Sequence, residues 1–132
     1  QNFLRTMLRV GGQRDELHVV ADQRGTPTPA WLIADATAAV LRQGIVESGI
    51  RHLVAGGGTT WHGSAEAIFD EAVQRGLLAR RPMVTSITTA QYPTPAARPG
   101  YSVLDTHRLR DEYAIALPDW RLALAATFDR AQ

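Results

Sequence analysis

Apolar residues in four stretches of the chain recur every three or four positions, which is the spacing of an amphipathic helix. The first helix is expected to end at Gly11-Gly12 and the second at Gly44, because glycine commonly follows a last helical turn. A short further helix is expected after Asp105 or Thr106, either of which can cap it. The four stretches are residues 3–10, 31–41, 61–73 (capped by Thr59 or Thr60) and 120–128.

Three shorter runs are rich in β-branched and other apolar residues, and they predict strands. They are residues 17–21 (LHVVA), 51–55 (RHLVA) and 83–88 (MVTSIT). Strands that alternate with helices indicate an α/β fold with parallel pairing. Three short strands make a thin sheet, which would leave apolar faces for further protein to cover. We therefore expect a piece of a longer protein, and a first residue that is Gln1 rather than Met agrees with this expectation.

The composition excludes several kinds of chemistry. The 132 residues include fourteen arginines, no lysine and no cysteine, which rules out a catalytic lysine, a thiolate nucleophile and a disulfide. The formal net charge is +1 and the arginines are scattered, so the chain lacks the basic stripe of a nucleic-acid-binding protein. No apolar run approaches the roughly 20 residues of a membrane span. We expect one compact cytoplasmic domain that binds neither nucleic acid nor membrane.

A run of glycines and the four histidines could in principle bind a phosphate or a metal, but the spacing of neither set favours it. Gly56-Gly57-Gly58 joins a predicted strand to a helix, but a G-x-G-x-x-G turn would need a glycine at Trp61, so a plain turn is favoured over a phosphate site. The four histidines are far apart and lack metal-ligand spacing, so surface or core positions are favoured over a metal site. The histidines are His18, His52, His62 and His107.

Arg98 differs from the other arginines in its surroundings. It lies in residues 92–99 (YPTPAARP), where three prolines stiffen a loop that cannot be helical. A guanidinium on a fixed backbone suits bidentate binding of a phosphate, although most loop arginines are simply solvated. Local sequence alone leaves these two interpretations of Arg98 equally open.

Four blocks of the sequence occur in the order found in one enzyme family. Residues 22–28 (DQRGTPT) match a D-Q-x-G-x-P-T pattern, and residues 52–61 (HLVAGGGTTW) match H-L-x-x-x-G-x-T-x-W. The set is completed by residues 92–99 with 102–105 (SVLD), and by 117–120 (LPDW). Through these ordered blocks the chain resembles, over essentially its whole length, the dTDP-4-dehydrorhamnose reductases, members of the extended short-chain dehydrogenases.

The resemblance implies an enzyme that transfers a hydride from NADPH or NADH to the 4-keto group of dTDP-4-dehydro-L-rhamnose. Members of the family hold the cofactor on an N-terminal Rossmann domain and use a Ser or Thr with Tyr-x-x-x-Lys for acid/base work. Residues 1–132 carry neither feature. The resemblance therefore implies that this chain is the C-terminal, substrate-binding half of an extended Rossmann-type reductase, that it has no catalytic residue, and that the cofactor binds to the absent N-terminal half.

The same resemblance assigns seven residues to the nucleotide-sugar site. Asn2 begins the helix that borders the substrate, and two valines lie beside the base on the first strand. The residues of the first block line the sugar and diphosphate, and the loop arginine grips the diphosphate. The seven are Asn2, Val19, Val20, Gln23, Thr26, Thr28 and Arg98. Trp61 and Trp120 lie on apolar helical faces and are expected in the core instead.

Two further expectations concern assembly and activity. Some family members pair through their C-terminal halves around Mg²⁺ held by glutamates, at positions that appear here as Trp31 and Arg130. Neither side chain ligates a hard cation, so Mg²⁺ is not expected, although a homo-oligomer remains open. A non-catalytic relative, such as the regulatory subunit of methionine adenosyltransferase, is the alternative to a reductase.

Overall fold

The computed structural model describes residues 2–44 and 47–130, so Gln1 lies outside the described residues. The chain divides into two compact units. The sheet unit comprises Gln1–Gly25 and Thr59–Ser102, and the helical unit comprises Thr26–Gly58 and Val103–Gln132. Each unit is built from two separate stretches of sequence, which is why composition and length did not reveal the division.

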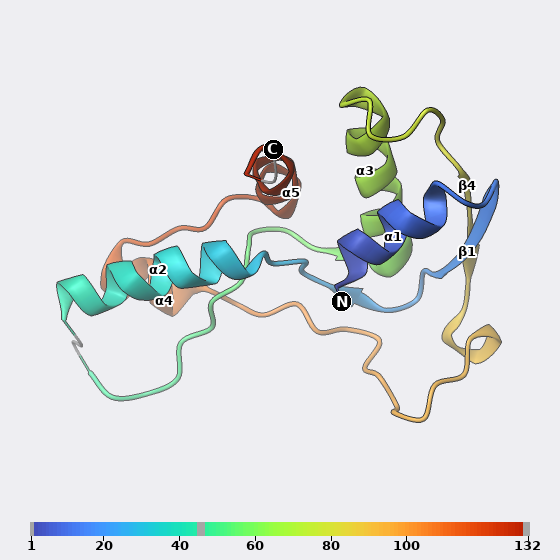
Figure 1. Ribbon diagram of the computed structural model, residues 1–132. Helices are drawn as coiled ribbons and strands as arrows, with labels where there is room; N and C mark the ends of the chain where they lie inside the picture. Colours follow the sequence, from blue (N-terminus) through green and yellow to red (C-terminus); the bar gives the residue numbers. More distant parts are fainter. Residues whose placement is uncertain (1, 45–46, 131–132) are drawn as a thin grey trace. The chain divides into compact units, whose positions relative to one another are not determined.

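The sheet unit contains a pair of parallel strands and two packed helices (Figure 1). Strand β1 (Glu16–Val20) pairs with β4 (Met83–Ile87) in a register that sets Leu17 beside Val84. Helix α3 (Trp61–Gln74) contacts both strands and α1 (Phe3–Gly11). A second, antiparallel pair joins β2 (Arg24–Gly25) to β3 (Thr59–Thr60), and the 3₁₀ helix η1 (Thr89–Gln91) follows β4. The core residues are Met7, Leu17, Val19, Ala65, Ile68, Phe69 and Ala72.

The close approach of α1 to α3 depends on a glycine. A Cβ atom built on Gly11 would lie 3.0 Å from Cζ and 3.2 Å from Cδ1 of Phe69, whose side chain is fully buried. Because carbon atoms pack at about 3.5–4.0 Å, no larger residue fits at position 11 without movement. Gly12, the next residue, has only ordinary contacts around its Cβ position.

In its described residues, the helical unit contains three helices joined by long connections (Figure 1). They are α2 (Ala30–Gln43), α4 (His107–Tyr113) and α5 (Trp120–Asp129). The Asp119 side chain caps α5 by accepting from the backbone N–H of Arg121. Buried residues include Leu32, Ala36, Ala55, Leu109, Tyr113, Trp120, Ala123 and Phe128. Within the described parts of the chain, no helix is long and apolar enough to cross a membrane.

The predicted strand at residues 51–55 is wrong, and so is the expected three-stranded parallel sheet. Residues 51–55 form no strand, and the backbone N–H groups at the end of this segment bind a side chain and a loop carbonyl. The backbone N–H of Ala55 donates to Thr28 Oγ1 (3.1 Å), and that of Gly56 donates to the Pro118 carbonyl (2.8 Å). Parallel pairing is confirmed for β1 and β4, and isolated parallel bridges join Arg24 to Tyr101 and Gly56 to Asp119. The predicted helices are confirmed with boundaries shifted by one or two residues.

Candidate functional site

The amide of Gln23 lies at the centre of a chain of hydrogen bonds in the sheet unit. The indole N–H of Trp61 donates to Gln23 Oε1 (3.1 Å), and Gln23 Nε2 donates to Thr89 Oγ1 (2.9 Å). The Thr89 hydroxyl donates in turn to Asp22 Oδ1 (2.7 Å). We call these four residues the Gln23 relay. Three separate segments of sequence supply them: the loop after β1, the first turn of α3, and η1.

Asp22 ends the relay on a negative charge. Both of its carboxylate oxygens also accept from the backbone N–H of Thr89 at 2.9 Å. These hydrogen bonds stabilise the ionised form, and the Thr89 hydroxyl and then its N–H hold the pKa of Asp22 below its usual value. The carboxylate therefore fixes the start of η1, the short helix from which the loop carrying Arg98 continues.

Trp61 was expected in the core, and this expectation is wrong. Its side chain is 40% exposed, and its ring packs edge-on against Phe3 with centroids 4.9 Å apart. Trp61 is the first residue of α3, so the apolar face that periodicity assigned to it reaches the surface at that end of the helix. Trp120, by contrast, is 2% exposed, which confirms its expected core position.

Asn2 and the two valines border this part of the sheet unit in different ways. Asn2 Oδ1 accepts from the backbone N–H of Arg5 (2.9 Å), so its side chain caps α1, and the next residue, Phe3, contacts Trp61. Val19 is buried in the core and Val20 is half-buried at the end of β1. Asn2 is thus brought near the Gln23 relay through Phe3, whereas the side chain of Val19 is covered by the core.

Arg98 lies on the exposed loop after η1, as the proline pattern predicts. Residues 91–100 are all exposed, and Thr94 Oγ1 donates to the Ala96 carbonyl (2.9 Å) within the loop. Among the residues that the structure describes, none forms a hydrogen bond or ion pair with the Arg98 guanidinium. The side chain is therefore available to an anionic ligand.

Thr26 and Thr28 belong to the helical unit, where both hydroxyls already have partners. Thr26 Oγ1 donates to the Gly57 carbonyl (2.9 Å), and Thr28 Oγ1 donates to the Thr26 carbonyl (3.1 Å). Thr28 Oγ1 also accepts from the backbone N–H of Ala55. These bonds hold residues 26–28 against the glycine turn, so the two threonines shape the loop rather than lie free.

The glycine turn is packed against an acidic residue. Gly57 has a φ of 74°, and a Cβ there would lie 2.5 Å from Asp119 Oδ2. The carboxylate that covers the turn would repel a phosphate, which supports the prediction of a plain turn over a phosphate site. The residues at this turn therefore do not fit the diphosphate of a nicotinamide dinucleotide.

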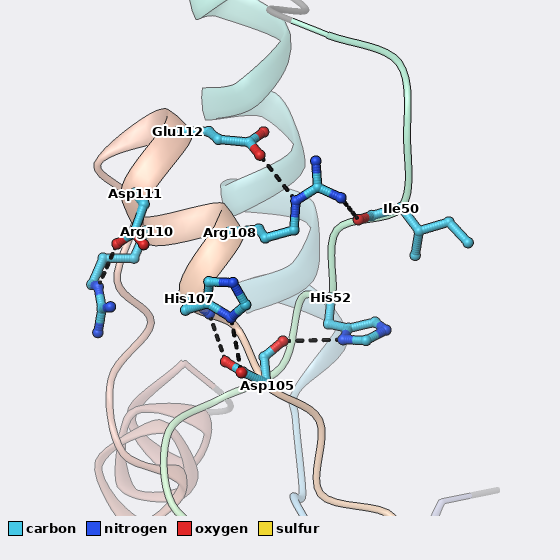
Figure 2. A network of polar contacts seen from close by, with 8 residues as sticks. All are labelled: Ile50, His52, Asp105, His107, Arg108, Arg110, Asp111 and Glu112. Carbon is cyan, nitrogen blue, oxygen red and sulfur yellow. Dashed lines mark hydrogen bonds and ion pairs between the residues drawn. The ribbon is translucent and has the colours of Figure 1, made fainter.

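A polar network in the helical unit surrounds the start of α4 (Figure 2). The Asp105 carboxylate accepts from the backbone N–H of His107 (2.8 Å) and contacts His107 Nδ1 (2.8 Å). His52 Nδ1 contacts the Asp105 carbonyl at 3.0 Å. Two histidines that are far apart in sequence thus meet one aspartate, yet within the described residues no group of three potential ligands could hold a metal.

Two arginines converge on Glu112 in the same network. Arg51 Nε donates to Glu112 Oε2 (2.6 Å), and Arg108 Nε donates to Glu112 Oε1 (3.0 Å). The guanidinium groups hold the pKa of Glu112 below its usual value, Arg51 more than Arg108. This ion-pair cluster joins Arg51 to α4.

Trp31 and Arg130 interact with each other. The Arg130 guanidinium lies 4.4 Å from the centroid of the Trp31 ring and 3.6 Å from the Asp35 carboxylate. Trp31 Nε1 also donates to Thr127 Oγ1 (3.0 Å). These contacts connect α2 to the end of α5.

The fold matches solved structures of dTDP-4-dehydrorhamnose reductases. A dTDP-4-dehydrorhamnose reductase from Clostridium acetobutylicum matches with a TM-score of 0.86 and 32% identity, over 100% of this chain and 44% of that protein. The corresponding enzyme from Bacillus anthracis, solved in complex with NADP, has a TM-score of 0.86 and 29% identity over the same shares. The described chain is thus part of an α/β fold.

Sequence comparison identifies the family. The dTDP-4-dehydrorhamnose reductase of Escherichia coli is 43% identical over 126 residues, which are 93% of this chain and 42% of that protein. A model of the RmlD substrate binding domain matches residues 1–132, and the chain belongs to this family. The chain spans less than half the length of these relatives and corresponds to their C-terminal half.

Proposed function

We propose that the protein containing this chain is an NAD(P)H-dependent dTDP-4-dehydrorhamnose reductase, and that residues 1–132 form its substrate-binding half. The observation that carries this proposal is the match of the substrate binding domain family to the whole chain. The E. coli relative is named as such a reductase, and one solved relative is complexed with NADP. The parent reaction would transfer a hydride to the 4-keto group of dTDP-4-dehydro-L-rhamnose.

The residues of this chain would bind and orient the nucleotide sugar. Arg98 carries an unpaired positive charge on a proline-stiffened loop, which suits a diphosphate. The Gln23 amide is held in one position beside an exposed tryptophan and so can direct a hydrogen bond at the sugar. Asn2 and Val20 lie in the same unit as Gln23. In the helical unit, Thr26 and Thr28 would shape the loop in which they lie.

The hydride donor would be held elsewhere. Asp119 covers the glycine turn of this chain, and the sequence has no lysine for a Tyr-x-x-x-Lys pair. We therefore assign the cofactor and the acid/base groups to a part of the protein outside residues 1–132. The regulatory alternative has less support, because the relatives described above are named as reductases.

Titration of the full-length protein with dTDP and with NADPH tests this assignment. Arg98→Ala should weaken dTDP binding by about 1.5–3 kcal/mol, the range for a hydrogen bond to a charged group. Arg98→Lys should restore part of the loss, because an ammonium keeps the charge but lacks the planar fork. NADPH affinity should stay the same in both variants.

Arg42→Ala is the matched control, since it removes an exposed arginine from the end of α2. It should leave both affinities unchanged. Equal loss of dTDP and NADPH binding in Arg98→Ala would indicate misfolding, and unchanged dTDP binding would remove Arg98 from the site. A wild-type protein that neither binds dTDP nor oxidises NADPH with the 4-keto sugar would refute the proposed function.

A further inference from the structure

The direction of every hydrogen bond in the Gln23 relay is fixed from both ends. An indole N–H can only donate, so the Gln23 atom facing Trp61 at 3.1 Å must be the amide oxygen. At the other end, an ionised carboxylate can only accept, so the Thr89 hydroxyl must donate its hydrogen to Asp22 (2.7 Å). Thr89 Oγ1 then has only lone pairs to offer Gln23, and it accepts from Nε2 at 2.9 Å.

This chemistry excludes the flipped amide. Turning the Gln23 amide by half a turn would face its NH₂ group toward the indole N–H and its oxygen toward a hydroxyl already committed to Asp22. Both contacts would be lost, so the relay leaves one amide orientation. The assignment of amide oxygen and nitrogen, which is often ambiguous, is determined here by the partners.

The relay uses half of the hydrogen-bonding capacity of the amide. A glutamine side chain has two N–H donors and an oxygen with two lone pairs, and one of each is occupied by Thr89 and Trp61. Gln23 is only half-buried and Trp61 is 40% exposed, so a ligand can reach this group. Among the residues that the structure describes, none takes up the second N–H of Gln23, so it is a donor whose position is set before any ligand arrives.

We propose that Trp61 and Thr89 are positioning residues for substrate recognition: they orient Gln23 so that its free N–H donates to a hydroxyl or phosphate oxygen of the nucleotide sugar. This inference rests on the proposed function. It adds Trp61 and Thr89 to the residues that affect substrate binding, and it specifies that Gln23 donates a hydrogen bond to the substrate. A pre-oriented amide loses little conformational freedom on binding, which raises affinity without adding a contact. Trp61 and Thr89 therefore act through Gln23 and need not touch the substrate.

Steady-state kinetics of the full-length reductase with the dTDP-4-keto sugar tests the relay. Trp61→Phe keeps the ring against Phe3 but removes the N–H, and Thr89→Val removes the hydroxyl while Thr89→Ser keeps it. Trp61→Phe and Thr89→Val should each raise the KM for the sugar about three- to tenfold, the effect of weakening one neutral hydrogen bond. The kcat and the KM for NADPH should change little, and Thr89→Ser should behave like wild type.

The decisive variant combines Trp61→Phe with Gln23→Ala. If Trp61 acts only through Gln23, the double variant should have the KM of Gln23→Ala alone. Trp31→Phe is the matched control, because it removes an indole hydrogen bond to a threonine in the helical unit, and it should leave the KM unchanged.

Each alternative outcome is informative. If the KM effects of Trp61→Phe and Gln23→Ala multiply, Trp61 contributes independently and the relay is refuted. If wild type turns over the sugar and Trp61→Phe has the wild-type KM, this inference fails while the proposed function stands. If wild type neither binds nor reduces the sugar, the proposed function fails and the inference falls with it.

Discussion

Replacement of Gly11 by alanine is expected to destabilise the protein, although alanine favours helices more than glycine does. A Cβ at position 11 would lie within 3.0–3.2 Å of two carbons of the Phe69 ring and closer still to Cε1. That ring is fully buried, so it cannot turn outward into solvent without disturbing its neighbours. Overpacking of this kind costs about 1–3 kcal/mol. Gly11 is the last residue of α1, so alanine returns less than the ~1 kcal/mol of helix propensity found in a helix interior. The net loss should be about 1–2 kcal/mol.

Gly12 provides a control one residue away. The nearest atoms to its Cβ position lie 3.5–3.7 Å away, an ordinary contact, and its φ of −72° suits any residue. Gly12→Ala restricts the unfolded chain without straining the folded one, so it should be neutral or stabilise by up to about 1 kcal/mol. Two adjacent glycines are thus expected to respond with opposite signs, which no general property of glycine explains.

Thermal unfolding followed by circular dichroism measures the difference. A change of 1 kcal/mol corresponds to a Tm shift of roughly 3–6 °C for a chain of this size. Gly11→Ala should therefore lower the Tm by several degrees and Gly12→Ala should not. Phe69→Leu introduced beside Gly11→Ala tests the cause, because a smaller side chain relieves the clash and the two losses should not add. Equal Tm values for the two alanine variants, or fully additive losses in the double variant, would contradict the packing argument.

Two further predictions concern acid and metal. Three carboxyl groups have pKa values below their usual range. The pKa of Asp22 is lowered by hydrogen bonds from Thr89, and that of Asp105 by hydrogen bonds from the backbone N–H and the ring of His107. The pKa of Glu112 is lowered chiefly by the hydrogen bond from Arg51. Groups with a lowered folded pKa contribute stability above their unfolded pKa and lose it as the pH falls through the folded value. The Tm should therefore drop as the pH falls below about 4, and Asp22→Asn should flatten that drop; a Tm independent of pH in this range would contradict the assigned hydrogen bonds. Addition of Mg²⁺ or EDTA should leave the sedimentation coefficient of the chain unchanged, because Arg130 and Trp31 bind each other and offer no oxygen ligand; a Mg²⁺-dependent shift would overturn this reading.

The sequence predicts the helices of this chain better than its strands, for a physical reason. Helical periodicity and caps are local, so the cap of α3 could be narrowed to Thr59 or Thr60 from its neighbours alone, and the structure shows Thr60, whose side chain accepts from the Gly63 N–H. A strand exists only if another segment pairs with it. Residues 51–55 have a strand-like composition, but Thr28 and Pro118 take up the neighbouring backbone groups that a ladder would need. Nothing in the local pattern indicates these distant partners.

The candidate site was harder to predict from local sequence than the helices, because its residues are brought together by contacts between distant parts of the chain. Gln23 is 38 residues from Trp61 and 66 from Thr89, and Asp22 is 67 from Thr89. The resemblance identified Gln23 and passed over Asp22 and Thr89. Periodicity placed Trp61 in the core, because it reports which side of a helix is apolar and says nothing about the exposed end of the helix. The one available signal lay in the motif blocks themselves. Asp22 and Gln23 begin the first block, Trp61 ends the second, and Thr89 lies just before the third. The first two blocks, although separate in sequence, thus meet at the Gln23 amide.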